Sequence, residues 1–286
     1  MNDNYGDTSR SEGLAYEELL LESLNSMVKN SSYIPVIDAK KCDDIFGKKT
    51  TTKADGMFVD AKTKGISIKN PQKSSSSIQV FVPSKDKLIA ALENVLIMPQ
   101  EAKNYLELWL GQQSQEELFE VCKKMGVDPG GLEYKDEVRR IRLKHSSIPE
   151  VYQIAFMQYI NDPSIKSELF DLSFSRGFCK NKVNHAEYML WCDSTKGGKG
   201  TTSHLSVCKM SELKNKVMKF DWAIRDSQTV WALGPLTLQM KGSGKKSGAS
   251  YHSPQFNASL NDLKKHCPDV FVDGDLVEMH NFIKNM

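Results

Sequence analysis

The sequence predicts a fold that combines helices and strands, of the α/β or α+β class, built on a mixed β-sheet flanked by helices. Three observations support this prediction. Strand patterns dominate residues 43–82, helical patterns dominate the middle of the chain up to residue 160, and strand patterns return from residue 185. A chain that runs from strands to helices and back to strands is typical of a mixed sheet, and not of a helical bundle or a β-sandwich.

The N-terminal part predicts one helix followed by a β-hairpin. Residues 1–10 are polar and are expected to form a loose terminus. Ser11–Met27 carries leucines with acids between them, which is the pattern of an amphipathic helix. Two short strands are then predicted at residues 53–59 and 65–70, joined by a turn at residues 62–65.

The predicted hairpin brings an acid close to a lysine. Asp55 opens the first strand and Lys69 closes the second. Because side chains alternate between the two faces of a strand, Ile66 and Ile68 are predicted to point into a core, and Ser67 and Lys69 to share the opposite, wetter face. A carboxylate beside a lysine can hold a divalent cation and activate a water molecule, which is the minimal equipment for hydrolysing a phosphodiester.

The middle of the chain is predicted to be helical, because capping residues recur along it. Serine or proline marks the start of several segments and glycine marks the end of two, as the preferences of helix termini require. A run of four serines, Ser74–Ser77, is predicted to be a mobile loop before the first of these helices. The predicted helices are Ser84–Ile97, Pro99–Gly111, Ser114–Gly126, Lys135–His145 and Pro149–Ile160.

Beyond residue 185 the pattern is strand-like again, with two loops rich in glycine and lysine. The loops are residues 196–200 and 241–248, and neither has the spacing of a phosphate-binding P-loop. A final helix is predicted from Ser259 to Cys267. The predicted strands are residues 186–192, 204–208, 229–233 and 236–241.

Composition limits the classes of protein to which the chain can belong. Its 286 residues are 40% hydrophobic and 26% charged, and the net charge is only +2, so that nucleic-acid binding has to rest on local basic clusters. Six cysteines are scattered without a Cys-x-x-Cys pair, which argues against zinc sites and disulfides. No apolar run resembles a signal peptide or reaches the roughly 18 residues of a membrane span. We therefore expect a cytoplasmic protein with no membrane partner.

The hairpin also carries a resemblance to a known family. Asp55, followed after an eleven-residue gap by Ser67-Ile68-Lys69, resembles the Asp…(Asp/Glu)-x-Lys signature of the PD-(D/E)xK nuclease superfamily, in its type II restriction endonuclease branch. Ser67 stands where the second carboxylate usually lies, and in this respect the chain is similar to some compact restriction enzymes that cut four-base sites. Gly13–Glu17 resembles a Gly-x-x-x-Glu helix of the superfamily whose glutamate faces the metal site, so that Glu17 would supply the missing charge.

The C-terminal region carries a second similarity. Residues 236–242 run into a basic loop and then into residues 253–257, which resembles a C-terminal strand and loop that contact DNA in some small restriction enzymes. Glutamine and asparagine can pair with adenine, and lysine can donate to guanine or bind phosphates. The residues predicted to contact DNA are Lys53, Lys73, Ser74, Ser75, Gln239, Lys241, Lys245, Lys246, His252, Gln255 and Asn257.

The resemblance implies a restriction-endonuclease-like core within a single nuclease domain, residues 1–286. In this division, residues 11–97 form the catalytic core, residues 98–175 a helical subdomain and residues 176–286 a strand-rich segment that recognises DNA.

The resemblance also implies the chemistry of the site. The expected catalytic residues are Asp55, Ser67, Lys69 and Glu17. A Mg²⁺ ion is expected to be bound by Asp55, by the backbone carbonyl of Ile68 and by Glu17.

The implied function is Mg²⁺-dependent cleavage of double-stranded DNA at a short recognition site. Such an enzyme would act as a monomer or a homodimer, with a cognate DNA methyltransferase in the same host. Two alternatives stay open on the sequence alone. One is a structure-specific nuclease of repair or recombination from the same superfamily, and the other is a non-catalytic DNA-binding protein in which Asp55 and Lys69 have no chemical role.

Overall fold

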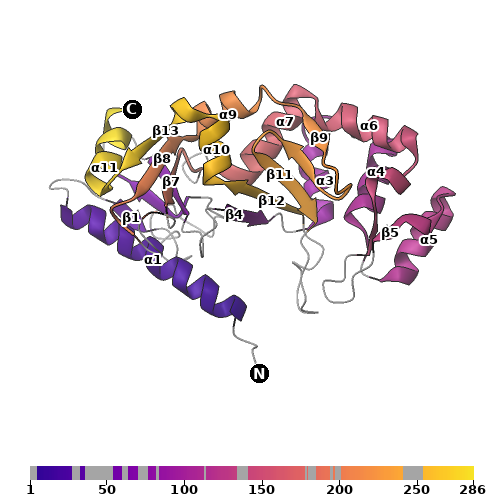
Figure 1. Cartoon of the computed structure of the whole chain (residues 1–286), viewed down its shortest axis with the longest axis horizontal. Helices are drawn as coiled ribbons and strands as arrows, with labels where there is room; N and C mark the ends of the chain where they lie inside the picture. The colour runs from indigo at the N-terminus through magenta and orange to yellow at the C-terminus, as the bar shows by residue number, and fades with distance from the viewer. Residues whose placement is uncertain are drawn as a thin grey trace. The chain divides into compact units, whose positions relative to one another are not determined.

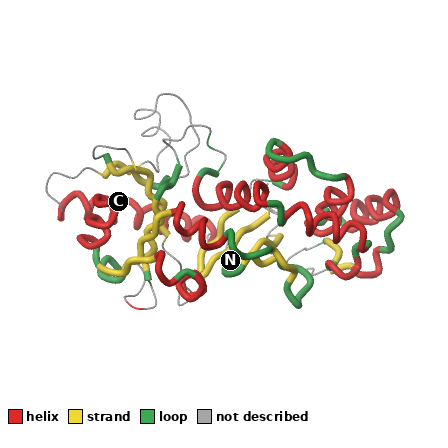
Figure 2. Tube along the Cα trace, turned by 90° about the horizontal axis from the view of Figure 1, so that it is seen from above, coloured by secondary structure: helices red, strands yellow, loops and turns green. Residues whose placement is uncertain are grey.

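The chain is a mixed α+β protein that divides into two compact units (Figures 1 and 2). The first unit comprises residues 1–78, 174–216 and 259–286, and the second comprises residues 79–173 and 217–258. Each unit is built from separated stretches, whereas the three segments predicted from the sequence are contiguous. The computed structural model describes residues 5–27, 33–35, 54–59, 64–69, 77–81, 84–112, 114–133, 141–177, 179, 185–193, 196, 201–240 and 254–286.

The first unit holds a six-stranded mixed sheet. β3 and β7 are parallel and the other neighbouring strands are antiparallel. In their order across the sheet, the strands are β1 (Tyr33–Pro35), β2 (Gly56–Phe58), β3 (Lys64–Lys69), β7 (Tyr188–Cys192), β8 (Leu205–Lys209) and β13 (Phe271–Gly274). The helices are α1 (Tyr5–Met27), α9 (Met210–Val217), whose last residue belongs to the second unit, α10 (Leu260–His266) and α11 (Leu276–Asn285).

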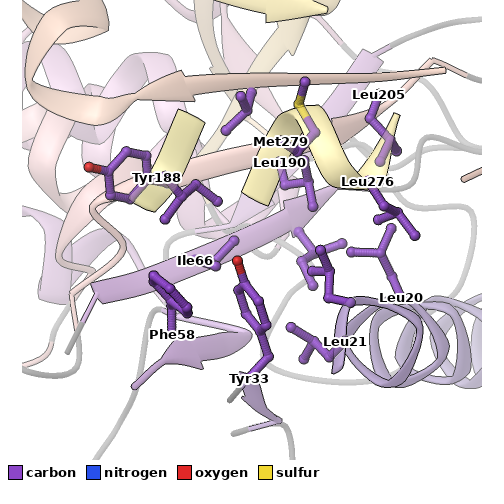
Figure 3. Close-up of a cluster of buried hydrophobic side chains, with 14 of the residues drawn as sticks. Leu20, Leu21, Tyr33, Phe58, Ile66, Tyr188, Leu190, Leu205, Leu276 and Met279 are labelled. Carbon is purple, nitrogen blue, oxygen red and sulfur yellow. The ribbon is translucent and has the colours of Figure 1, made fainter. Parts of the chain in front are cut away.

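One face of this sheet forms a core with α1 and α11. Figure 3 shows leucines of α1 beside side chains of α11 and of the central strands. Ile66 and Ile68 belong to this cluster and are fully buried, as the strand alternation predicts. Burying a leucine or isoleucine side chain stabilises a fold by about 1.5–3 kcal/mol, so this cluster holds β3 firmly in place.

The second unit holds most of a five-stranded sheet, in the order β4 (Ser77–Phe81), β12 (Pro254–Ser259), β11 (Leu236–Met240), β10 (Trp231–Leu233) and β9 (Trp222–Ile224). The first two residues of β4 and the last residue of β12 belong to the first unit. From β9 to β12 the pairing is antiparallel. A small hairpin pairs β5 (Leu132–Glu133) with β6 (Arg142–Leu143). The helices are α3 (Lys85–Glu93), α4 (Gln100–Leu110), α5 (Gln115–Met125), α6 (Glu150–Ile160) and α7 (Pro163–Phe170).

Aromatic side chains make up the centre of the second unit. Tyr105 of α4 stacks on Phe156 of α6 with ring centroids 4.5 Å apart, and Trp231 of β10 meets both rings edge-on. The indole nitrogen of Trp231 donates to the hydroxyl of Tyr105 over 3.0 Å, and that hydroxyl is 2.9 Å from Nδ1 of His145. Burial lowers the pKa of His145, so its imidazole favours the neutral form.

Most of the predicted helices are confirmed because their caps are local. Ser84 accepts a hydrogen bond from the amide of Lys87 at the start of α3, and Ser114 accepts one from Glu117 at the start of α5. Gly126 ends α5 with a φ of 66°, a left-handed conformation that glycine adopts without strain. The predicted helices at 99–111, 149–160 and 259–267 are also present, within one or two residues.

Other predicted elements differ from the structure. Helix α1 begins at Tyr5, so the first described residues are helical and not a loose terminus, and α3 ends at Glu93 instead of near Ile97. Apolar spacing marks only the part of a helix that packs on a core, and the first buried residue of α1 that is described is Tyr16.

The predicted helix 135–145 is wrong at its C-terminal end. Arg142–Leu143 is a strand, Ile141 bridges to Gln112, and residues 145–147 form a 3₁₀ turn. Long-range pairing decides the conformation there, and local propensity gives no sign of it. Residues 135–140 lie outside the described residues, as do Ser74–Ser76 of the predicted loop Ser74–Ser77. The prediction is wrong at Ser77, which is the first residue of strand β4.

Candidate active site

The backbone of β2 and β3 sets the position of Asp55. Its amide donates to the carbonyl of Ile66 over 2.8 Å, which continues the β2–β3 pairing by one residue. Gly65 allows β7 to approach on the other side, because its carbonyl accepts from Glu187 over 2.8 Å and an added Cβ would lie 1.9 Å from the carbonyl oxygen of His185. Any larger residue at position 65 would push these strands apart.

The carboxylate of Asp55 is held by three donors. Its Oδ2 accepts from Oγ of Ser67 at 3.0 Å, from the amide of Ile68 at 2.7 Å and from Nζ of Lys69 at 3.1 Å. The three donors come from consecutive residues of β3, so the strand itself fixes the orientation of the carboxylate. All four residues lie on the strands predicted to carry the site.

Lys69 lies at the end of β3 and is partly buried. Its side chain is 20% exposed, and that of Asp55 is 24% exposed. Nζ of Lys69 also donates to the backbone carbonyl of Ile68 over 3.0 Å. The ammonium group therefore sits between two oxygen atoms, the Asp55 carboxylate and the Ile68 carbonyl.

Glu17 of α1 belongs to the same electrostatic environment. Burial, and after it the negative charge of Asp55, raise the pKa of Glu17 to about 8, while the charge of Lys69 lowers it. Because its pKa responds to both residues, Glu17 lies near them, although it precedes Asp55 by 38 residues in the sequence. Burial is the largest cause of this shift, and together with the charge of Asp55 it favours the protonated form of Glu17 at neutral pH.

Ser67 differs from the prediction that it lies on a wet face. Its side chain is fully buried, and its hydroxyl donates to Asp55. Ser67 thus orients the Asp55 carboxylate through this hydrogen bond, whereas a carboxylate at position 67 would repel it. Ser67 is better described as a positioning residue than as a group that reaches solvent.

The oxygen atoms at this site suit a hard cation. Mg²⁺ prefers carboxylate and carbonyl oxygens and keeps several of its waters, so that two carboxylates and one carbonyl suffice as protein ligands. Asp55, Ile68 and Glu17 offer this set. Among the described residues, no group of three or more histidine, cysteine, aspartate or glutamate side chains could hold a metal ion.

The residues predicted to contact DNA fall into two groups. Gln239, Gln255 and Asn257 lie on β11 and β12 in the sheet of the second unit. Gln239 pairs with Gln255 and Thr237 with Asn257 across the two strands. The rest lie outside the described residues: Lys53, Lys73, Ser74, Ser75, Lys241, Lys245, Lys246 and His252.

Side-chain hydrogen bonds connect the polar residues Gln255, Asn257 and Thr237 on β11 and β12. The amide nitrogen of Gln255 donates to Oδ1 of Asn257, and Nδ2 of Asn257 lies 3.4 Å from Oγ1 of Thr237. Gln255 is nearly buried, whereas Gln239, Asn257 and Thr237 are partly exposed. Thr237 is not among the residues predicted to contact DNA, although its position two residues before Gln239 on a strand places both side chains on one face.

No protein-family model matches the chain, and no curated protein matches it. No helix in the described part of the chain is long and apolar enough to cross a membrane.

Proposed function

We propose that the chain is a Mg²⁺-dependent endonuclease that cleaves double-stranded DNA at a short specific sequence, with a restriction-endonuclease-like core in its first unit. The observation that carries this proposal is the arrangement around Asp55. A carboxylate, a second carboxyl group from α1 and a lysine amine share one partly buried place at the end of a sheet. Phosphodiester hydrolysis needs these groups: anionic ligands for a cation and a positive group for the developing phosphorane charge.

Each residue has one task in this mechanism. Asp55, Glu17 and the Ile68 carbonyl would hold Mg²⁺, which supplies Lewis-acid activation of the phosphate and of a water molecule. Lys69 stabilises the negative charge that builds up on the phosphate oxygens and orients the attacking water. Ser67 and the amide of Ile68 keep the Asp55 carboxylate oriented. In-line attack then leaves a 3′-hydroxyl and a 5′-phosphate.

Sequence recognition is assigned to the second unit. Gln239 and Asn257 offer amide groups that can pair with adenine in the major groove, where donor and acceptor patterns differ between base pairs. The lysines of residues 241–246 would bind phosphates, so affinity for DNA should fall steeply with salt. A host that carries such an enzyme needs a cognate DNA methyltransferase to protect its own sites.

The proposal is tested by incubating the protein with phage DNA and Mg²⁺ and sequencing the ends of the products. Discrete fragments with one sequence at every end are the expected result. Cleavage only at junctions or flaps would favour a structure-specific nuclease, and intact DNA with a mobility shift would favour a non-catalytic binding protein. Asp55→Asn serves as the matched inactive protein, because asparagine has the size of aspartate and an oxygen that can accept from Ile68.

A further inference from the structure

The position of the Lys69 amine is unusual for a residue that is to act on a phosphate. Nζ donates at once to Oδ2 of Asp55, 3.1 Å away, and to the carbonyl oxygen of Ile68, 3.0 Å away. These are two of the oxygens that the proposed function assigns to the cation. The ammonium group therefore lies where the lone pairs of both ligands converge.

An ammonium group and a divalent cation compete for Oδ2 of Asp55 and the carbonyl oxygen of Ile68. Mg²⁺ binds oxygen at about 2.0–2.1 Å, so a cation on both atoms would lie within a few ångströms of Nζ. Two positive centres that close repel strongly, and the partly buried setting weakens the screening by water. A cation bound to both oxygen atoms therefore favours the departure of the ammonium group.

We propose that Lys69 is a built-in counter-ion that the divalent cation displaces, so that cation binding releases the lysine amine for its task on the DNA phosphate. This inference rests on the proposed function and concerns the same site. In the cation-free protein the ammonium neutralises Asp55. In the cation-bound protein the same amine swings away from Asp55 and becomes available to an anionic group.

The remaining contacts of Asp55 make this exchange feasible. When Nζ leaves, Oδ2 still accepts from the Ser67 hydroxyl and from the Ile68 amide, over 3.0 and 2.7 Å. Both donors are fixed in the buried part of β3. The carboxylate thus keeps its orientation without the lysine, and only the flexible side chain of Lys69 has to move.

The first test measures the chemical reactivity of the amine. The protein is treated with acetic anhydride without DNA, in chelator or in saturating Ca²⁺ or Mg²⁺, and acetylation of each lysine is followed by peptide mass spectrometry. Lys69 should be acetylated at least about fivefold faster when the cation is bound. Fivefold is the lower limit of the usual change that one bound group causes in the affinity of another. Lys64 is the control, because it lies on the same strand and its amine donates to the carbonyl of Ile283 over 2.6 Å, away from the site.

The second test measures cation affinity by isothermal titration calorimetry. Lys69→Met should bind Mg²⁺ or Mn²⁺ on the order of tenfold more tightly than the unchanged protein, because the competing charge is gone. Lys64→Met removes the same charge from the same strand and should leave the affinity unchanged. Equal affinities of the unchanged protein and Lys69→Met would overturn the exchange.

The outcomes separate this inference from the proposed function. Cation binding with unchanged reactivity of Lys69 would reject the exchange alone, since the amine would have stayed on Asp55. Failure of the unchanged protein to bind Mg²⁺, Mn²⁺ or Ca²⁺, with or without DNA, would reject the metal site and the proposed function together. Higher reactivity of Lys69 with tighter binding by Lys69→Met supports the exchange.

Discussion

The two units use their buried polar groups in different ways. In the first unit, the ionisable groups of Asp55, Glu17 and Lys69 gather at the end of two strands, where burial and the charge of Asp55 favour the protonated form of Glu17. In the second unit, Tyr105 and Trp231 form neutral hydrogen bonds inside an aromatic core. Neutral groups that satisfy one another need no further partner, whereas burying ionisable groups costs free energy, and such clusters occur most often at functional sites. This difference agrees with our proposal, which places the chemistry in the first unit, and the aromatic network of the second unit supports its fold.

The largest expected effect comes from the charge of Asp55. Asp55→Asn keeps the shape of the side chain and one acceptor oxygen but removes the anionic ligand, so DNA cleavage in Mg²⁺ should fall roughly 10²- to 10³-fold or more. The melting temperature should change little, since Ile68 keeps its acceptor. The measurement is the rate of cleavage under single-turnover conditions. Unchanged cleavage by this variant would mean that Asp55, and with it the site in the first unit, does not take part in the reaction.

The opposite result is expected in the aromatic core of the second unit. Tyr105→Phe removes the hydroxyl that accepts from the Trp231 indole and contacts His145, which leaves buried polar groups without their partner. The free energy of unfolding should fall by about 1–3 kcal/mol, while cleavage by the folded protein should stay the same. Urea denaturation measures the loss, with Tyr152→Phe on α6 as the matched control. A stable but inactive Tyr105→Phe protein would place part of the chemistry in the second unit.

The sequence predicts the first unit better at its site than at its edges. Asp55, Ser67 and Lys69 lie on two strands close in sequence, so period-2 alternation is enough to bring them together. The approach of Glu17 depends on the packing of α1 against the sheet, and here only the resemblance to nucleases pointed to it. The buried state of Ser67 was missed because alternation distinguishes two faces but does not tell whether the second face is covered.

Elements set by distant contacts were also missed. Strand β13 and helix α11 follow the last predicted helix, and β13 is recognised only through its pairing with β8. Helix α11 does have a local signal, the capping box formed by Asp275 and Glu278, although the predicted elements end at Cys267. Strand β6 in the second unit has no such signal, because it is defined by its pairing with β5, which is not adjacent to it in the sequence.

A third prediction concerns the pH dependence of stability that the charge cluster creates. Glu17 has a pKa of about 8 in the folded protein and about 4.5 in the unfolded chain. Between these values the folded state holds more protons, so the free energy of unfolding falls as the pH rises from about 4.5 to 8. Glu17→Gln removes this contribution, and its stability should fall less over the same range. Urea denaturation in chelator at pH 5, 6.5 and 8 measures the difference.

The exposed Glu22 on the same helix provides the control. Glu22→Gln should follow the pH curve of the unchanged protein. Parallel curves for Glu17→Gln and the unchanged protein would mean that Glu17 is ionised like an ordinary surface acid. Burial and the charge of Asp55 would then not raise its pKa.

The smallest effect on cleavage is expected for a substitution of Lys64. Because Lys64 and Lys69 carry the same charge on the same strand, comparing them separates the effect of position from that of charge. The amine of Lys64 donates to the carbonyl of Ile283 in the last turn of α11 and lies 5.8 Å from the centre of the Tyr188 ring. Lys64→Met keeps the length of the side chain and should cost about 1 kcal/mol or less, as expected for a cation at a helix C-terminus, with no loss of cleavage. Lys69→Met removes the same charge and should lose cleavage while stability hardly changes. Thermal denaturation and cleavage rates of the two variants test this contrast. Equal losses of cleavage would mean that the general positive charge of β3 matters, and that the contact between Lys69 and Asp55 does not.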